Sequence, residues 1–179
     1  NLAASNPQLR TFLQQADICY CDGRGVQWAA ALLGGSLPQR MTGADWIEDL
    51  SAQAASLGWR IAWVGGEPGI TDTAARELRS RHPSLQVVYT DHGFHDAQDC
   101  SLIERINDAS PDILLVGMGS PIQEEWVNRH REALTSPVVW CLGATADYVS
   151  GSLRRGPAWL TRRHEWLARL IIEPRRLGR

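Results

Sequence analysis

Short apolar runs that alternate with longer helix-like segments are the feature of this sequence that most constrains its fold. The runs are residues 17–21, 60–64, 85–90, 112–116 and 138–142. Helical patterns cover residues 26–33, 42–57, 98–109 and 121–134. Strands that alternate with helices form βαβ units, whose right-handed crossovers build a parallel sheet. The sequence therefore predicts an α/β fold: an open, mainly parallel, Rossmann-like sheet of five strands with helices on both faces.

Charge is distributed unevenly along the chain, and this divides it into two predicted parts. All 18 basic residues are arginine; eight of them lie in residues 154–179 against two glutamates, which gives that stretch a formal charge of +6. The first 153 residues carry ten arginines and 18 acidic residues, which gives −8. We expect an α/β domain over residues 1–152 and a basic helical appendage over 153–179. An anionic partner for the appendage follows, either a membrane or a nucleic acid.

The appendage has the pattern of an amphipathic helix. One side gathers Trp159, Leu160, Trp166, Leu167, Leu170 and Ile171. Arg162, Glu165 and Arg169 lie opposite, as in helices that rest in a membrane interface. A terminal helix docked on the body explains the same pattern. Nucleic acid is disfavoured, because the body shows no basic platform interleaved with aromatic residues. No spanning segment or leader is apparent, so we expect neither an integral nor a secreted protein.

Cysteine usage predicts no metal centre. The four cysteines form no C-x-x-C pair and have no histidine at metal-ligand spacing. Three of them, Cys19, Cys21 and Cys141, fall in the apolar runs. Buried, reduced thiols are therefore expected.

In open parallel sheets ligands bind beyond the carboxyl ends of the strands, so the residues after each run are the candidate site. Asp22 follows the first run directly and precedes Gly23, where the backbone can approach a ligand. A carboxylate in this place suits a general base. An Asp-Gly turn with a solvated carboxylate is the alternative.

The segment after the fourth run predicts an anion site. Gly117 and Gly119 form a turn before a helix start, whose N–H groups and dipole favour a diphosphate. Gln123 lies in the first turn of that helix and offers donors to a phosphate or sugar; an exposed helix residue is the alternative. Arg40 is a loop arginine that suits phosphate, although such a residue is more often a surface charge.

A uracil site is predicted from residues after the third and fifth runs. Phe94, next to Gly93, supplies a ring for stacking, and Asp147 supplies an acceptor for the base N–H. Taken separately, each is more often a packing or capping residue.

Several of these segments occur in a specific order along nearly the whole chain. They are residues 21–25, 40–43, 65–69, 92–94, 111–124, 143–147, 165–170 and 173–176. In this series the chain resembles the WecG/TagA/CpsF family of bacterial glycosyltransferases. Members normally begin with a further segment that carries a Thr/Asn-containing wall of the site, and the present sequence starts after it. Phe94 stands where the family often has tyrosine.

The resemblance implies an inverting, metal-independent transferase of the GT-E type that needs no cofactor. It implies a UDP-sugar donor and a polyprenyl-pyrophosphate-linked acceptor, with the enzyme cytoplasmic and peripheral on the inner face of the plasma membrane through residues 154–179. The donor sugar would be N-acetylmannosamine, its uronic acid or glucose. By position Asp22 matches the family's catalytic base, Arg40 and Gln123 the residues that engage the donor, and Asp147 the uracil-side acid. A homo-oligomer is compatible with the sequence, and a non-catalytic, membrane-tethered nucleotide-binding scaffold is the rival function.

Overall fold

The computed structural model describes residues 2–22, 24–36, 41–95 and 100–153. Gly23, Arg40 and the predicted appendage lie outside these residues. The described helices are α1 (Leu2–Ser5), α2 (Pro7–Gln15), α3 (Arg24–Leu32), α4 (Gly43–Leu57), α5 (Ile70–Arg81), α6 (Cys100–Asp108), α7 (Ile122–His130) and α8 (Thr145–Ser150). The strands are β1 (Arg60–Gly65), β2 (Gln86–Asp91), β3 (Ile113–Gly117) and β4 (Val138–Cys141).

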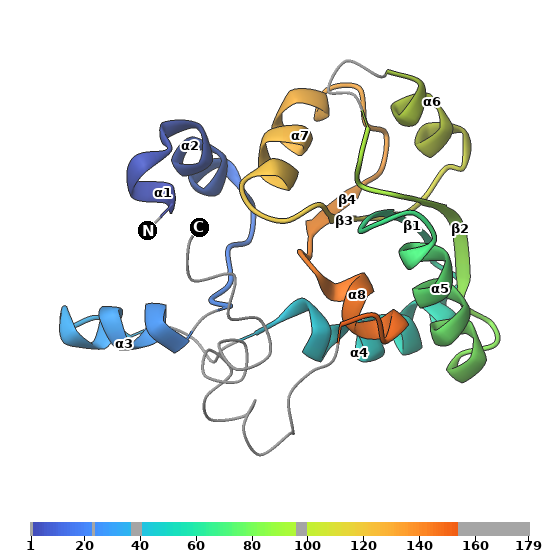
Figure 1. The fold of residues 1–179 in the computed structure, drawn as a ribbon, viewed down its shortest axis with the longest axis horizontal. Helices are drawn as coiled ribbons and strands as arrows, with labels where there is room; N and C mark the ends of the chain where they lie inside the picture. Colours follow the sequence, from blue (N-terminus) through green and yellow to red (C-terminus); the bar gives the residue numbers. More distant parts are fainter. Residues whose placement is uncertain (1, 23, 37–40, 96–99, 154–179) are drawn as a thin grey trace.

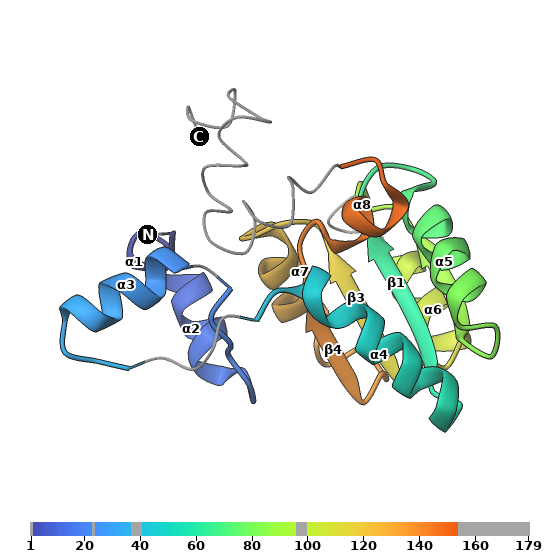
Figure 2. The ribbon, with the colours of Figure 1, turned by 90° about the horizontal axis from the view of Figure 1, so that it is seen from below.

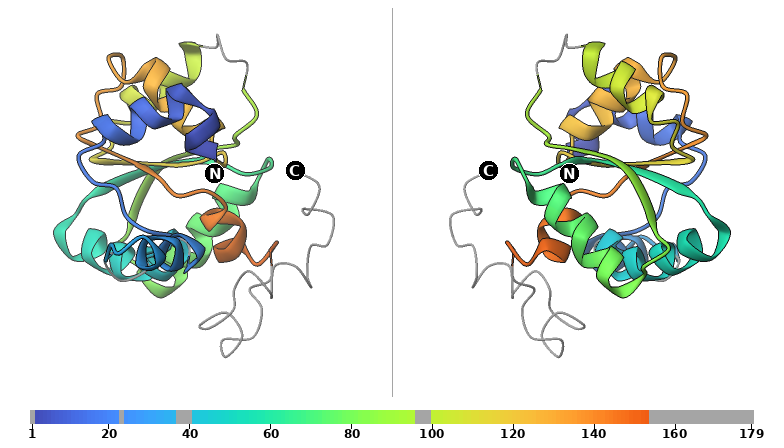
Figure 3. Two further views of the ribbon diagram at one scale, coloured as in Figure 1. Left: turned by 90° about the vertical axis from the view of Figure 1, so that its left-hand side faces the viewer. Right: turned by 90° about the vertical axis from the view of Figure 1, so that its right-hand side faces the viewer.

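The four described strands form one parallel sheet in the order β2-β1-β3-β4 (Figure 1). This order confirms the predicted α/β class and four of the five predicted strands. Helices cover both faces of the sheet, as Figure 3 shows. Because every strand runs in the same direction, all carboxyl ends lie at one edge, which is where a ligand is expected.

Alternate residues of each strand fill two separate cores. One core joins Trp63 of β1 and Leu115 of β3 to α4, α5 and α8. The other joins Val64 and Leu114 to α6 and α7. Trp63, Val64, Leu114 and Leu115 are fully buried. A strand that is buried on both faces reads as a continuous apolar run, and this is why these strands could be recognised in the sequence.

The predicted strand over residues 17–21 is wrong. Within the described residues this segment is irregular, and the Ile18 side chain is 81% exposed. The segment lies beside β4, the outer strand of the sheet. An apolar cavity of about 800 Å³ separates the two, and its lining includes Ile18 and Tyr20 of the segment and Val139 and Trp140 of β4. Without a ladder of backbone hydrogen bonds to β4, an apolar run does not become a strand. The expectation of a buried thiol also fails at Cys19, which is exposed.

Helix α4 begins as predicted, with Thr42 in the N-cap position. The Thr42 hydroxyl donates to Asp45 at 2.7 Å instead of capping the backbone. Helix α3 lies away from the sheet in Figures 1 and 2. Among the described helices, none combines the length and the apolar character that a membrane crossing requires.

Candidate functional site

At the carboxyl ends of β1, β3 and β4, the backbones of Gly66, Gly117 and Gly143 pack against one another. We call these ends of the three strands the glycine-lined edge. The Gly66 N–H donates to the carbonyl of Gly117 at 3.2 Å. A Cβ atom on Gly117 would lie 2.7 Å from the carbonyl oxygen of Gly143, closer than real Cβ contacts allow. Because side chains do not fit here, backbone groups line this edge of the sheet. At Gly119 and Gly143, by contrast, an added Cβ would meet no atom within 4 Å, so there is open space beside the main chain at these two residues.

The turn after β3 carries both expected and opposing features for an anion. Gly119 has a φ of +80°, a left-handed conformation that favours glycine, and its carbonyl accepts from the Gln123 N–H at 2.9 Å. However, the first turn of α7 contains Glu124 and Glu125. Carboxylates at a helix N-terminus already use the favourable dipole, so a diphosphate here needs compensating positive charge. The predicted source, Arg40, lies outside the described residues.

Gln123 is buried, with 5% of its surface exposed, so the alternative of an exposed helix residue is wrong. Its Oε1 accepts from the Gly143 N–H at 3.0 Å, and its Nε2 donates to Glu124 Oε1 at 2.8 Å. The side chain thus links α7 to the turn after β4. This places Gln123 at the candidate site as a positioning group, with one amide hydrogen still available to a ligand.

Glu124 is a site residue that the sequence analysis missed. Its side chain is buried, and its Oε2 has no hydrogen-bond partner among the described residues. Burial, with the nearby charge of Glu124, raises the pKa of the Cys141 thiol to about 12, so this thiol stays protonated at neutral pH. A buried carboxylate oxygen without a donor is costly.

Tyr20 connects the N-terminal segment to the outer strand β4 by hydrogen bonds. Trp140 Nε1 donates to the Tyr20 hydroxyl at 3.0 Å, and this hydroxyl donates to the Cys141 carbonyl at 3.3 Å. Burial raises the pKa of the Tyr20 hydroxyl, the hydrogen bond from Trp140 offsets part of that rise, and the negative charge of Asp22 adds to it. Such charge effects require proximity. The Asp22 carboxylate therefore lies close enough to the Tyr20 hydroxyl for its charge to act there.

Asp22 itself is exposed at the end of the irregular segment. The carbonyl of its neighbour Cys21 accepts from the Met41 N–H at 2.9 Å, which fixes the backbone just before it. An exposed carboxylate on a fixed backbone fits both the predicted general base and the alternative of a solvated Asp-Gly turn. It follows an irregular segment instead of the strand that the sequence predicted.

The predicted uracil residues follow strands at opposite edges of the sheet. Gly93 follows β2, and its N–H donates to the Gly66 carbonyl at 2.9 Å. The ring of Phe94 is 66% exposed, so it is open to stacking. Asp147 lies in the first turn of α8 after β4, and its carbonyl accepts from the Leu153 N–H at 3.0 Å. Since β1 and β3 separate β2 from β4, the strand ends themselves do not bring Phe94 and Asp147 together.

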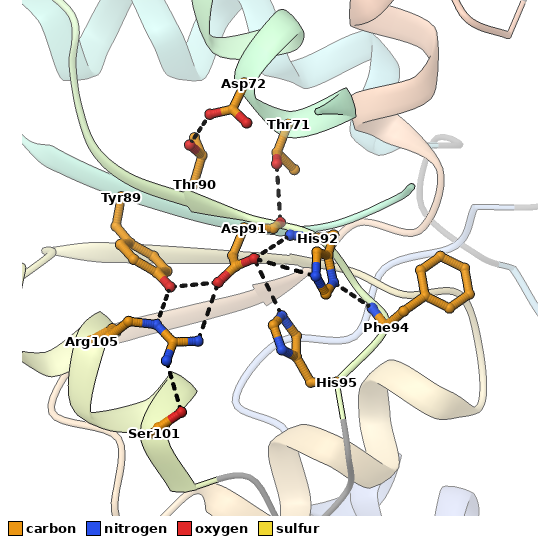
Figure 4. A network of polar contacts seen from close by, with 10 residues as sticks. All are labelled: Thr71, Asp72, Tyr89, Thr90, Asp91, His92, Phe94, His95, Ser101 and Arg105. Atoms are coloured by element: carbon orange, nitrogen blue, oxygen red, sulfur yellow. Dashed lines mark hydrogen bonds and ion pairs between the residues drawn. The ribbon is translucent and has the colours of Figure 1, made fainter. Parts of the chain in front are cut away.

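A second polar cluster, also missed, lies at the end of β2 (Figure 4). Asp91 Oδ2 accepts from the Tyr89 hydroxyl at 2.6 Å and faces Arg105 at 3.4 Å. Its Oδ1 faces His92 and His95. Burial acts to raise the pKa of Asp91, but the hydrogen bonds from Tyr89 and the His92 N–H, together with both histidines, hold it below its usual value. The spacing Asp-His-x-x-His was visible in the sequence and was the signal for this cluster.

Comparison with known proteins decides between an enzyme and a scaffold. The sequence model of the glycosyl transferase WecG/TagA/CpsF family matches residues 2–179. The chain belongs to this family. The resemblance noted above is thus confirmed, and the protein is a glycosyltransferase. A non-catalytic scaffold is not favoured by this membership.

Two relatives of this transferase come from Staphylococcus aureus. A protein of strain NCTC 8325 / PS 47, named N-acetylglucosaminyldiphosphoundecaprenol N-acetyl-beta-D-mannosaminyltransferase, is 28% identical over 180 residues, which cover 100% of this chain and 70% of the relative. A protein of the same name from strain MW2 is 27% identical with the same coverage.

Because the chain belongs to a glycosyltransferase family, donor and acceptor are expected at the carboxyl ends of the strands. A glycosyltransferase needs a place for its donor and a base beside the acceptor hydroxyl. In this family member Gly117, Gln123 and Gly143 lie together at the ends of β3 and β4. Phe94 and Gly93 lie on the β2 side of the glycine-lined edge.

Proposed function

We propose that this transferase moves N-acetylmannosamine from its UDP-linked donor to a polyprenyl-pyrophosphate-linked saccharide. The donor sugar and acceptor class are supported by the names of the Staphylococcus aureus relatives, which span the full length of this chain. The uronic acid of this sugar and glucose remain the other donors to test. The resulting glycan would serve cell-surface polysaccharide synthesis.

In the proposed reaction Asp22 takes the proton from an acceptor hydroxyl as its oxygen attacks the anomeric carbon of the donor. A new C–O bond forms on one face of the sugar while the C–O bond to the β-phosphate of UDP breaks on the other, which inverts the configuration. The electron pair of the broken bond leaves with UDP. No metal takes part in this proposal. The exposed Asp22 carboxylate, whose charge acts on the Tyr20 hydroxyl beside the end of β4, is the observation that supports it.

The other site residues have supporting roles in the proposal. The turn at Gly117 and Gly119, with Arg40, stabilises the charge that develops on the leaving diphosphate. Gln123 holds that turn against the Gly143 turn through its two hydrogen bonds. Phe94 stacks on uracil, Asp147 accepts from the base N–H, and Gly23 and Gly93 let the backbone approach the donor.

Substitution Asp22→Asn tests the base. We expect the rate of transfer to fall by about 10²–10⁴-fold, the usual contribution of a general base, while UDP affinity measured by calorimetry stays unchanged. Asp17→Asn is the matched control, because Asp17 is an exposed carboxylate on the same segment. Full activity of Asp22→Asn, or an equal loss in Asp17→Asn, would remove Asp22 from the mechanism.

We further propose that residues 1–152 form the catalytic domain and that residues 153–179 attach it to the inner face of the plasma membrane. The excess of arginine in that stretch supports the proposal, since each arginine near anionic lipid contributes roughly 1 kcal/mol. Deleting residues 154–179 should abolish sedimentation with phosphatidylglycerol vesicles. Vesicles of phosphatidylcholine alone are the control for charge. Undiminished sedimentation of the shortened chain would refute the membrane role.

A further inference from the structure

Three side chains at the end of β2 lie close together and have no role in the transfer reaction proposed above. Asp91, His92 and His95 each offer one ligand atom, and these atoms all lie within 4.8 Å of one another. Asp91 Oδ1 is 3.4 Å from His95 Nε2 and 3.9 Å from His92 Nε2. The two imidazole rings are stacked with their centroids 4.2 Å apart (Figure 4).

We propose that Asp91, His92 and His95 form a binding site for a divalent transition metal ion, with Zn²⁺ as the expected occupant. Imidazole nitrogen and carboxylate oxygen are ligands that Zn²⁺ accepts at about 2.0–2.2 Å, and three protein ligands with one water complete its usual four-coordinate shell. Mg²⁺ and Ca²⁺ prefer shells made of oxygen, so two histidines disfavour them. To bind one ion, the two stacked rings must turn out of their parallel arrangement so that a nitrogen of each points at the same ion as Asp91 Oδ1.

Hydrogen bonds orient the Asp91 carboxylate, as is usual for a side chain that binds a metal ion. Its Oδ2 accepts from the Tyr89 hydroxyl at 2.6 Å, and its Oδ1 accepts from the His92 backbone N–H at 2.8 Å while it faces the two imidazole rings. Groups that orient a ligating side chain in this way commonly raise metal affinity. The His92 side chain is 31% exposed and the His95 side chain 9%, so an ion can enter from the His92 side. Arg105, 3.4 Å from Oδ2, is the opposing charge and limits the affinity.

Metal binding would change one contact of the neighbouring loop. The Phe94 N–H donates to His92 Nδ1 at 3.1 Å. If His92 binds the ion through Nδ1, this acceptor is taken. If it binds through Nε2, the proton of the neutral ring must reside on Nδ1, which then cannot accept. With either nitrogen, Zn²⁺ releases the backbone amide of Phe94.

The test is a calorimetric titration of Zn²⁺ into the full chain after treatment with EDTA, in the absence of donor and acceptor. We expect one equivalent to bind, with affinity reduced at least tenfold in His92→Gln and in His95→Gln. His82→Gln is the matched control, because His82 Nε2 also faces a carboxylate, Glu48 at 3.1 Å, but belongs to no described three-ligand group. Arg105→Gln should bind Zn²⁺ more tightly than the parent chain.

A second readout covers variants that lose stability. Zn²⁺ should raise the Tm of the parent and of His82→Gln but not of His95→Gln, since an ion that binds only the folded state stabilises it. In amide hydrogen exchange, exchange at Phe94 should accelerate with Zn²⁺ in the parent and not in His92→Gln. The site would be overturned if the parent did not bind Zn²⁺ up to millimolar concentration, or if His92→Gln and His95→Gln bound it as tightly as the parent. Either result leaves the transfer reaction of Asp22 untouched, because no turnover is measured.

Discussion

The sheet and the N-terminal region of this enzyme use apolar residues in opposite ways. In the sheet, Leu114 of β3 is completely buried between neighbouring strands and helices. In α3, Trp28 is 54% exposed and Leu32 is 88% exposed, although this helix also has an apolar pattern. The comparison teaches that apolar composition alone does not determine burial. Pairing with distant segments does, and β3 has two strand partners whereas the segment before α3 has none among the described residues.

The largest effect is expected in the middle of the sheet. Leu114→Ala removes a fully buried side chain next to Ala62 of β1 and Val139 of β4. The free energy of unfolding should fall by about 2–5 kcal/mol, the usual cost of such a cavity. Urea denaturation followed by circular dichroism measures it. A loss under about 1 kcal/mol would show that the sheet core relaxes as easily as an exposed surface.

Two glycines, Gly117 at the strand ends and Gly25 in the N-terminal region, extend the comparison of the two regions. Gly117→Ala places a Cβ 2.7 Å from the Gly143 carbonyl oxygen, and a backbone atom cannot move aside as a side chain can. We expect a loss of about 1–3 kcal/mol in unfolding free energy, as for other overpacked sites, together with weaker UDP binding. Gly25→Ala is the control, because its Cβ would meet no atom within 4 Å and alanine is favourable in a helix, here in the first turn of α3. Equal losses in the two variants would mean that the strand ends are not tightly packed.

Strands β1, β3 and β4 were recognised from the sequence because each contains an unbroken apolar run, and β2 because Val87, Val88 and Tyr89 are typical strand residues. The same pattern at residues 17–21 misled, since a run of this length does not reveal whether a partner strand will pair with it. No element was predicted over residues 2–15, where the structure has α1 and α2.

At the candidate site, sequence position located the strand-end glycines and Asp22 but not the contacts among side chains. The burial of Gln123 and Glu124 depends on the turn at Gly143, which is 20 residues away from Gln123 along the chain. Their environment was therefore not readable from helix position alone. The Asp91 cluster differs, because its ligands are close in sequence. Cysteine spacing does not reveal this cluster, because it consists of an aspartate and two histidines.

The junction between the two regions should give an intermediate effect. Tyr20→Phe removes the hydroxyl that accepts from Trp140 and donates to the Cys141 carbonyl. We expect about 0.5–1.5 kcal/mol of lost stability, the net contribution of a hydrogen bond, and slower transfer because Asp22 lies two residues further on. Thermal unfolding and a transfer assay on the same preparation separate the two effects. Unchanged stability and rate in Tyr20→Phe would mean that the segment is held by other contacts.

The smallest effect is expected from the same chemical change as the largest, made in the other region. Leu32→Ala shortens a side chain that is 88% exposed at the end of α3, so little apolar surface is returned to water and no cavity forms. The free energy of unfolding should stay within about 0.5 kcal/mol of the parent, as for most surface substitutions. Measured beside Leu114→Ala under identical conditions, the difference between the two variants isolates the contribution of burial. A loss above about 1 kcal/mol would mean that Leu32 is covered in the folded protein, and the contrast between the two regions would then disappear.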